Sequence, residues 1–133
     1  MKQIFLLFSH LLTLEQKGEL ENDFKVKRIV SLPSKLQNVW SDIPPEIYSL
    51  KKHLKPILDW LDKNANPKDY VLVQGEFGAV FLTVDFCKSK NLIPIYATTE
   101  RVLAEETLAD NSVKTVRKFK HVRFREYEKY ELL

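Results

Sequence analysis

The chain has 133 residues, of which 44% are hydrophobic and 29% charged, and this composition fits one globular domain, residues 1–133, with its own core. No apolar segment approaches the roughly 18 residues of a membrane-spanning helix, so no membrane association is expected. The N-terminal apolar run is too short for a signal peptide, and the single cysteine excludes an internal disulfide, so we expect a cytoplasmic protein.

The first half of the chain predicts alternating strands and helices. Residues 3–8 are apolar throughout, as central parallel strands are. A helix is expected from Thr13 to about residue 23, with Gln16 completing a capping box, and residues 26–32 alternate as a second strand that Pro33 stops.

A longer helix is expected after one or two helical turns at residues 34–40. It would open at Pro44-Pro45, because proline suits a first helical turn, and Pro56 would kink or divide it. Apolar residues at 3–4 spacing mark its buried stripe: Ile47, Leu50, Leu54, Ile57, Leu58 and Leu61.

Residues 70–86 form the centre of the predicted fold. A buried strand at 70–73 is followed by the turn Gln74–Gly78 and by a helix so apolar that most of its sides should be covered. Two of the three glycines of the chain lie in this turn, where glycine allows a backbone to approach a ligand and helix N–H groups attract anions. The alternative is a plain strand-to-helix turn.

The last third predicts a strand at 93–97, then a hairpin of residues 101–108 and 113–124, and a frayed tail from residue 126. The expected fold class is therefore α/β: a Rossmann-like, three-layer, mostly parallel sheet with a C-terminal β-hairpin, about residues 100–125, at one edge.

Several familiar sites are absent from the sequence. There is no G-x-G-x-x-G or Walker A motif, and Cys87 and the histidines have no metal-ligand spacing, so neither cofactor nor metal is predicted. We interpret Cys87 as a core residue and His53 as a surface residue on its charged helix.

Polar residues follow three of the predicted strands. Parallel topology would bring Ser9-His10, Gln74-Gly75-Glu76 and Thr98-Thr99 to one edge of the sheet. Their hydroxyl, imidazole, amide and backbone donors suit phosphate and ribose. The sequence thus predicts a binding site for a phosphate-bearing ligand at this edge.

The hairpin carries most of the uneven charge. Net charge is +3, but six of the 21 Lys and Arg residues lie in the segment from Lys114 to Arg125, and this segment contains no acid. The rest of the chain therefore has 15 basic and 18 acidic residues and is slightly acidic. Such a strip predicts an anionic partner of limited size and no long nucleic-acid duplex, although a solvated hairpin is the alternative. By alternation, one face would combine cations, an aromatic ring and an imidazole, as single-stranded nucleic-acid sites do: Arg117, Phe119, His121, Arg123 and Arg125.

Four strings, FLLFSH at 5–10, VLVQGEFGA at 71–79, PIYATTERV at 94–102 and FKHVRFREY at 119–127, resemble the small stand-alone CARF-like proteins encoded beside type III CRISPR loci. The resemblance implies a Rossmann-fold homodimer that binds cyclic oligoadenylate second messengers, especially cyclic tetra-adenylate. It further implies a ring nuclease that cleaves the messenger and switches off the antiviral signal.

The expected activity is a metal-independent phosphodiesterase in which the substrate's ribose 2′-OH attacks the neighbouring phosphate. The alternatives are a binder that sequesters the ring intact and a regulatory partner of a CRISPR effector, which would have no nucleotide affinity. The residues expected to act are Ser9, His10 and His121 in catalysis and, in ligand binding, Gln74, Gly75, Glu76, Phe77, Gly78, Thr98, Thr99, Arg101, Lys120 and Arg123.

Overall fold

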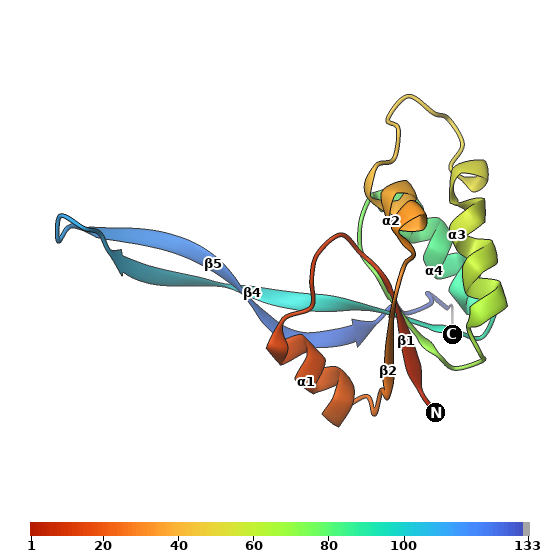
Figure 1. The fold of residues 1–133 in the computed structure, drawn as a ribbon, viewed down its shortest axis with the longest axis horizontal. Coiled ribbons are helices and arrows are strands. Elements are labelled where there is room, and N and C mark those ends of the chain that lie inside the picture. The colour runs from red at the N-terminus through yellow and green to blue at the C-terminus, as the bar shows by residue number, and fades with distance from the viewer. Residues whose placement is uncertain (132–133) are drawn as a thin grey trace.

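The computed structural model describes residues 1–131 and is a three-layer α/β fold with an antiparallel hairpin at one edge of its sheet (Figure 1). This confirms the predicted fold class. In chain order the elements are β1 (Gln3–Leu7), α1 (Leu14–Asn22), β2 (Arg28–Ser31), α2 (Ser34–Ser41), α3 (Lys51–Asn64), β3 (Tyr70–Val73), α4 (Phe77–Ser89), β4 (Ile93–Thr107) and β5 (Val113–Glu126).

The sheet has the strand order β2-β1-β3-β4-β5, with every neighbouring pair parallel except β4 and β5. All five residues of β1 and all four of β3 are buried, as expected for central strands covered on both faces. Among the described residues, no helix is long and apolar enough to cross a bilayer.

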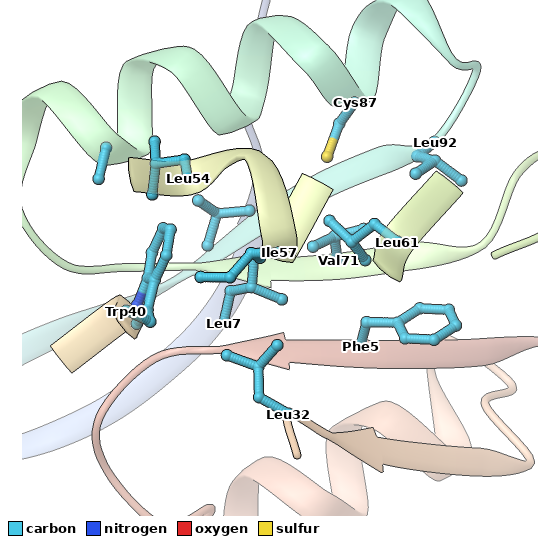
Figure 2. Close-up of a cluster of buried hydrophobic side chains, with 12 residues drawn as sticks. Phe5, Leu7, Leu32, Trp40, Leu54, Ile57, Leu61, Val71, Cys87 and Leu92 are labelled. Carbon is cyan, nitrogen blue, oxygen red and sulfur yellow. The ribbon is translucent and has the colours of Figure 1, made fainter. Parts of the chain in front are cut away.

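The two faces of the sheet are covered unequally. Leu20 of α1 packs with Ile4, Leu72 and Phe124 on one face. Helices α2, α3 and α4 cover the other face, where Trp40 joins a cluster of buried side chains (Figure 2). That cluster contains Phe5, Leu7, Leu32, Trp40, Leu54, Ile57, Leu61, Val71, Val73, Ala79, Cys87 and Leu92.

Local sequence signals explain where several helices begin. Thr13 caps α1, since its hydroxyl accepts from Gln16 N at 3.1 Å while the Gln16 side chain accepts from Thr13 N at 3.0 Å, which is the predicted capping box. The prediction for α3 is wrong: it begins at Lys51 and not at Pro44-Pro45. The residues after the prolines do not supply a buried face, because Ile47 and Tyr48 are exposed, so packing does not stabilise a helical turn there. Pro56 lies inside α3, which continues past it as one helix.

The hairpin differs from the prediction in its length. β4 is continuous from Ile93 to Thr107, because Thr98 and Thr99 stay extended and paired with β5. Beyond the sheet, β4 and β5 extend from the body as a two-stranded ribbon (Figure 1), and we call residues 99–121 the arm. Within the arm, every residue of the two strands is exposed except Ala104, Val116 and His121, which are half-buried.

The predicted frayed tail is anchored at its start. The Tyr127 hydroxyl donates to Val73 O, its backbone N–H donates to Pro94 O at 3.0 Å, and its ring lies 4.6 Å from that of Tyr96. Burial, reinforced by Tyr96, raises the pKa of Tyr127 to about 12. The predicted tail continues to Leu133, and its last two positions lie outside the described residues.

Candidate functional site

The strand order places a topological switch point between β1 and β3. From β1 the chain passes through α1 on one face to β2, and it returns through α2 and α3 on the other face to β3. Ligands of open α/β sheets bind outside the carboxyl ends of the strands at such a point. Ser9 follows β1 and Gln74 follows β3, so the predicted polar edge lies at the switch point.

Ser9 is held in a small hydroxyl and amide cluster. Its Oγ lies 2.8 Å from the Oγ of Ser41, and Gln37 Nε2 donates to Ser41 Oγ at 2.9 Å and to Phe8 O at 3.1 Å. Gln37 and Ser41 lie one turn apart on α2, and the sequence analysis missed both. The only sequence signal was their 3–4 spacing on a short helix, which nothing in the local pattern connects to β1.

The loop after β3 is fixed by contacts within the protein. The Gln74 side-chain oxygen accepts from Ala97 N at 2.8 Å, and its backbone carbonyl accepts from Trp40 Nε1 at 3.0 Å. Glu76 caps α4, because its Oε1 accepts from Ala79 N at 2.9 Å. A phosphate binding at this helix start would have to displace the Glu76 carboxylate from that N–H group.

Gly75 in this loop and Gly78 in the first turn of α4 leave room for neighbouring side chains. A Cβ on Gly75 would lie 3.1 Å from Trp40 Nε1, and one on Gly78 would lie 2.8 Å from Leu50 Cδ1. Neither glycine has a positive φ angle. Their small size is therefore already explained by packing against α2 and the start of α3, which favours the plain-turn alternative for the glycines themselves.

His10 is exposed beside the switch point. It lies beyond the end of β1, with its ring 6.3 Å from that of Phe8. It lines a cleft of about 570 Å³ together with Lys17, Ser31 and Gln37. An exposed imidazole beside a cation and a hydroxyl is able to exchange protons with a bound ligand.

His121 lies elsewhere, on the α1 face at the base of the arm. Its Nε2 is 2.6 Å from Glu19 Oε1, its ring is 4.8 Å from that of Phe124, and its side chain is only 6% exposed. The second Glu19 oxygen accepts from Phe124 N at 2.8 Å. Glu19 therefore joins α1 to β5, and we call this contact the clamp.

A β-bulge next to the clamp overturns the predicted alternation along β5. Thr98 is opposite Arg123 and Thr99 is opposite His121, which leaves Val122 as an extra residue. His121 consequently shares the α1 face with Phe124. Arg123 and Arg125 point to the other face, where Arg125 Nη1 donates to Tyr96 Oη at 3.0 Å. The cations of β5 are thus divided between two faces.

Thr98 and Arg123 form the last part of the edge. The Thr98 hydroxyl donates to Arg123 O at 2.8 Å and accepts from Arg123 N at 3.2 Å. Because β1, β3, β4 and β5 are consecutive in the sheet, Ser9, Gln74, Thr98 and Arg123 follow one another along its carboxyl edge. We call these four residues the rim.

The arm continues the rim away from the body. Arg101 lies over the Phe119 ring at 5.6 Å, and Thr99 and Lys120 are exposed. Residues 100–125 carry seven basic and four acidic side chains, and Lys118 pairs with Glu106 at 3.6 Å. The acids of β4 therefore offset part of the basic strip that β5 shows alone.

Two further predictions concern reactive and metal-binding groups. Cys87 is buried, as predicted, and desolvation raises its pKa to about 12, so the thiolate form is strongly disfavoured. Residues 1–131 contain no group of three or more His, Cys, Asp or Glu side chains placed to hold a metal ion. His53 is half-buried and its Nε2 lies 2.9 Å from Val39 O, so it joins α3 to α2 and is not a plain surface residue.

Comparison with known proteins gives one relative and one family. The chain is 48% identical over 130 residues to "Uncharacterized protein MJ1673" of Methanocaldococcus jannaschii. The aligned residues cover 98% of this chain and 100% of the relative. No solved structure matches the chain significantly. Neither comparison tests the resemblance to CARF-like proteins, which stays a prediction. The family match extends over residues 2–125, and the chain therefore belongs to the Uncharacterized protein MJ1673 family.

Proposed function

We propose that the protein binds a cyclic oligoadenylate, most specifically cyclic tetra-adenylate, at the rim and cleaves it as a ring nuclease of type III CRISPR signalling. The observation that carries this proposal is the rim itself: Ser9 and Gln74 follow β1 and β3 at the topological switch point, and Thr98 and Arg123 continue the same edge on β4 and β5. Such groups suit phosphate and ribose and offer little to an apolar ligand. If the ligand is this second messenger, which is made in the cytoplasm, the protein acts in the cytoplasm as well.

The proposed reaction uses a nucleophile that the substrate carries. A ribose 2′-OH attacks the adjacent phosphorus, the bond from phosphorus to the 5′ oxygen breaks, and a 2′,3′-cyclic phosphate remains. The 2′-OH proton leaves to a base, and the departing 5′ oxygen gains a proton. The rim would hold the phosphate in line for attack, and the guanidinium of Arg123, which lies opposite Thr98 in the sheet, would stabilise the charge that develops on it.

Of the two predicted histidines, His10 fits the acid–base role better. It is exposed beside Ser9 at the switch point, whereas His121 is nearly buried and paired with Glu19. A base must reach the proton that it removes. We therefore assign proton transfer to His10, and positioning of the arm to His121.

The test is single-turnover cleavage of cyclic tetra-adenylate by excess protein in excess EDTA, resolved by chromatography. We expect the 2′,3′-cyclic phosphate product, since a 2′-OH nucleophile needs no metal-activated water. His10→Ala should slow the reaction by about 10²–10⁴-fold with little loss of affinity. His121→Ala is the matched comparison, and its effect should appear mainly in binding.

The outcomes separate the proposal from its rivals. If EDTA abolishes cleavage and manganese restores it, the mechanism is wrong. If both histidine variants cleave normally, proton transfer by histidine is wrong and positioning by Ser9, Gln74 and the cations must suffice. A ring that is bound and returned intact identifies a non-catalytic binder, and no affinity for any ring size favours a regulatory partner of an effector.

A further inference from the structure

Helix α4 carries large apolar side chains on its outward side as well as on the sides that pack against the core. Ala79, Thr83 and Cys87 face inward and are fully buried. Phe77 and Phe81 face outward and are 94% and 73% exposed. Two large apolar side chains exposed on adjacent turns form an apolar patch, and such patches mark interaction sites, so this face is expected to have a partner.

The outward face combines a ridge with a groove. Phe77 and Phe81 lie one turn apart and form the ridge. Next to it a groove of about 620 Å³ lies between α4 and residues 127–129, with Val80, Val84 and Tyr127 in its walls. A ridge beside a groove on one face is self-complementary, because a two-fold rotation lets each ridge enter the opposite groove.

The charges around this groove also suit a second copy. Asp85 and Glu128 lie at its border together with Lys88 and Lys129. Because both signs are present on one face, a two-fold contact can place acids of one copy against cations of the other. The two phenylalanines alone offer roughly 250–400 Å² of apolar surface, about a third to a half of what each partner buries in a stable dimer.

We propose that the outward face of α4 is the contact between two copies of this chain in a two-fold dimer. The proposal rests on the exposed face and stands without any ligand. Its functional consequence rests on the proposed function: α4 begins directly after Gln74–Glu76, so a two-fold axis that runs along the paired helices would bring two rims to one side of the dimer. A ring of four nucleotides can itself have two-fold symmetry and would meet both rims equally.

The experiment is sedimentation of the ligand-free, full-length protein over a range of concentrations. Phe81→Glu is the test variant, and Phe119→Glu on the arm is the matched control, because Phe119 is 68% exposed and also aromatic. Both positions are exposed, so both variants should fold, which circular dichroism and thermal unfolding would verify. We expect Phe81→Glu to weaken dimerisation by at least about 30-fold, as loss of a hot-spot residue does, and Phe119→Glu to remain dimeric.

Three results would overturn the proposal: a wild-type monomer at all concentrations, a Phe81→Glu variant that dimerises normally, or equal dissociation of both variants, which would mean that the interface is not confined to α4. Failure of the proposed function looks different. In that case the wild type is a dimer and Phe81→Glu is a monomer, but neither binds cyclic tetra-adenylate.

Discussion

Strand β3 and the arm are both β-structure, but they are stabilised in opposite ways. All four residues of β3 are buried and have neighbouring strands on both sides. The arm is a two-stranded ribbon, exposed on both faces and joined to α1 only at its base, through the clamp. An isolated two-stranded hairpin is marginally stable in water. Substitutions in β3 should therefore change stability, and substitutions in the arm should change function.

The most direct test of this comparison is to replace one leucine in each of the two regions with alanine. Leu72 of β3 is 0% exposed and Leu103 of the arm is 70% exposed. Leu72→Ala should lower the free energy of unfolding by about 2–5 kcal/mol, since it leaves a cavity in the core. Leu103→Ala should change it by less than about 0.5 kcal/mol. Urea unfolding measures both, and a large loss for Leu103→Ala would mean that the arm is packed against something in solution.

The clamp tests how the two regions are joined. Glu19→Ala removes the acceptor of the Phe124 N–H and the partner of His121, so we expect a loss of about 1–3 kcal/mol. Hydrogen exchange at the Phe124 amide should accelerate together with exchange in the arm. Glu21→Ala, an exposed acid on the same helix, is the control. Unchanged exchange at Phe124 in Glu19→Ala would show that the bulge holds the arm without the clamp.

The contribution of the arm to ligand binding can be tested by removing cations that lie at different distances from the rim. If the proposed ligand binds at the rim, Arg123→Ala should weaken binding and reduce the slope of log affinity against log salt by about one. Lys120→Ala should act in the same direction but less, because Lys120 is opposite Glu100, farther along the arm. Lys118→Ala, already paired with Glu106, should have the smallest effect. Normal binding in all three variants would mean that Arg123 does not contact the ligand and that the arm is only a solvated edge.

The last prediction concerns the alkaline loss of stability of the body. Burial raises the pKa of Cys87 from 9.0 to about 12 and that of Tyr127 from 10.0 to about 12. The unfolded chain releases these protons first, so the stabilisation is complete below about pH 9 and is lost as the pH rises toward 12. The urea midpoint should fall between about pH 8 and pH 10.5, and less so in Cys87→Ala. An equal fall in that variant would assign the loss to other groups.

The body of the fold could be predicted because its signals are local and redundant. Apolar runs marked β1 and β3, and Thr13 with Gln16 marked the start of α1. The start of α3 was mispredicted since Ile47 continues the apolar spacing of the helix but is 37% exposed in a loop. Spacing alone does not reveal whether an apolar side chain is buried within the same chain. Phe81 is a second example, because it has the apolar spacing of α4 but is 73% exposed.

The site was predictable in its position but not in its contacts. Parallel topology alone placed Ser9 and Gln74 at one edge, and the strand order agrees. The bulge at Val122 has no sequence signature, and it reversed the faces of Arg123 and Arg125. Partners supplied by distant helices, such as Ser41 for Ser9 and Glu19 for His121, depend on tertiary packing and have no local pattern.

Trp40 gives the switch point an optical reporter. Its indole is 2% exposed, donates to Gln74 O and lies against Gly75, so its surroundings change whenever that loop moves. The sequence has one other tryptophan, Trp60, which packs edge-on against Phe5 in the core. In a Trp60→Phe background the emission comes from Trp40 alone. Fluorescence of the unlabelled protein then reports movement of the loop after β3 during a ligand titration. The signal does not require cleavage, so it would also detect a ring that is bound and stays intact.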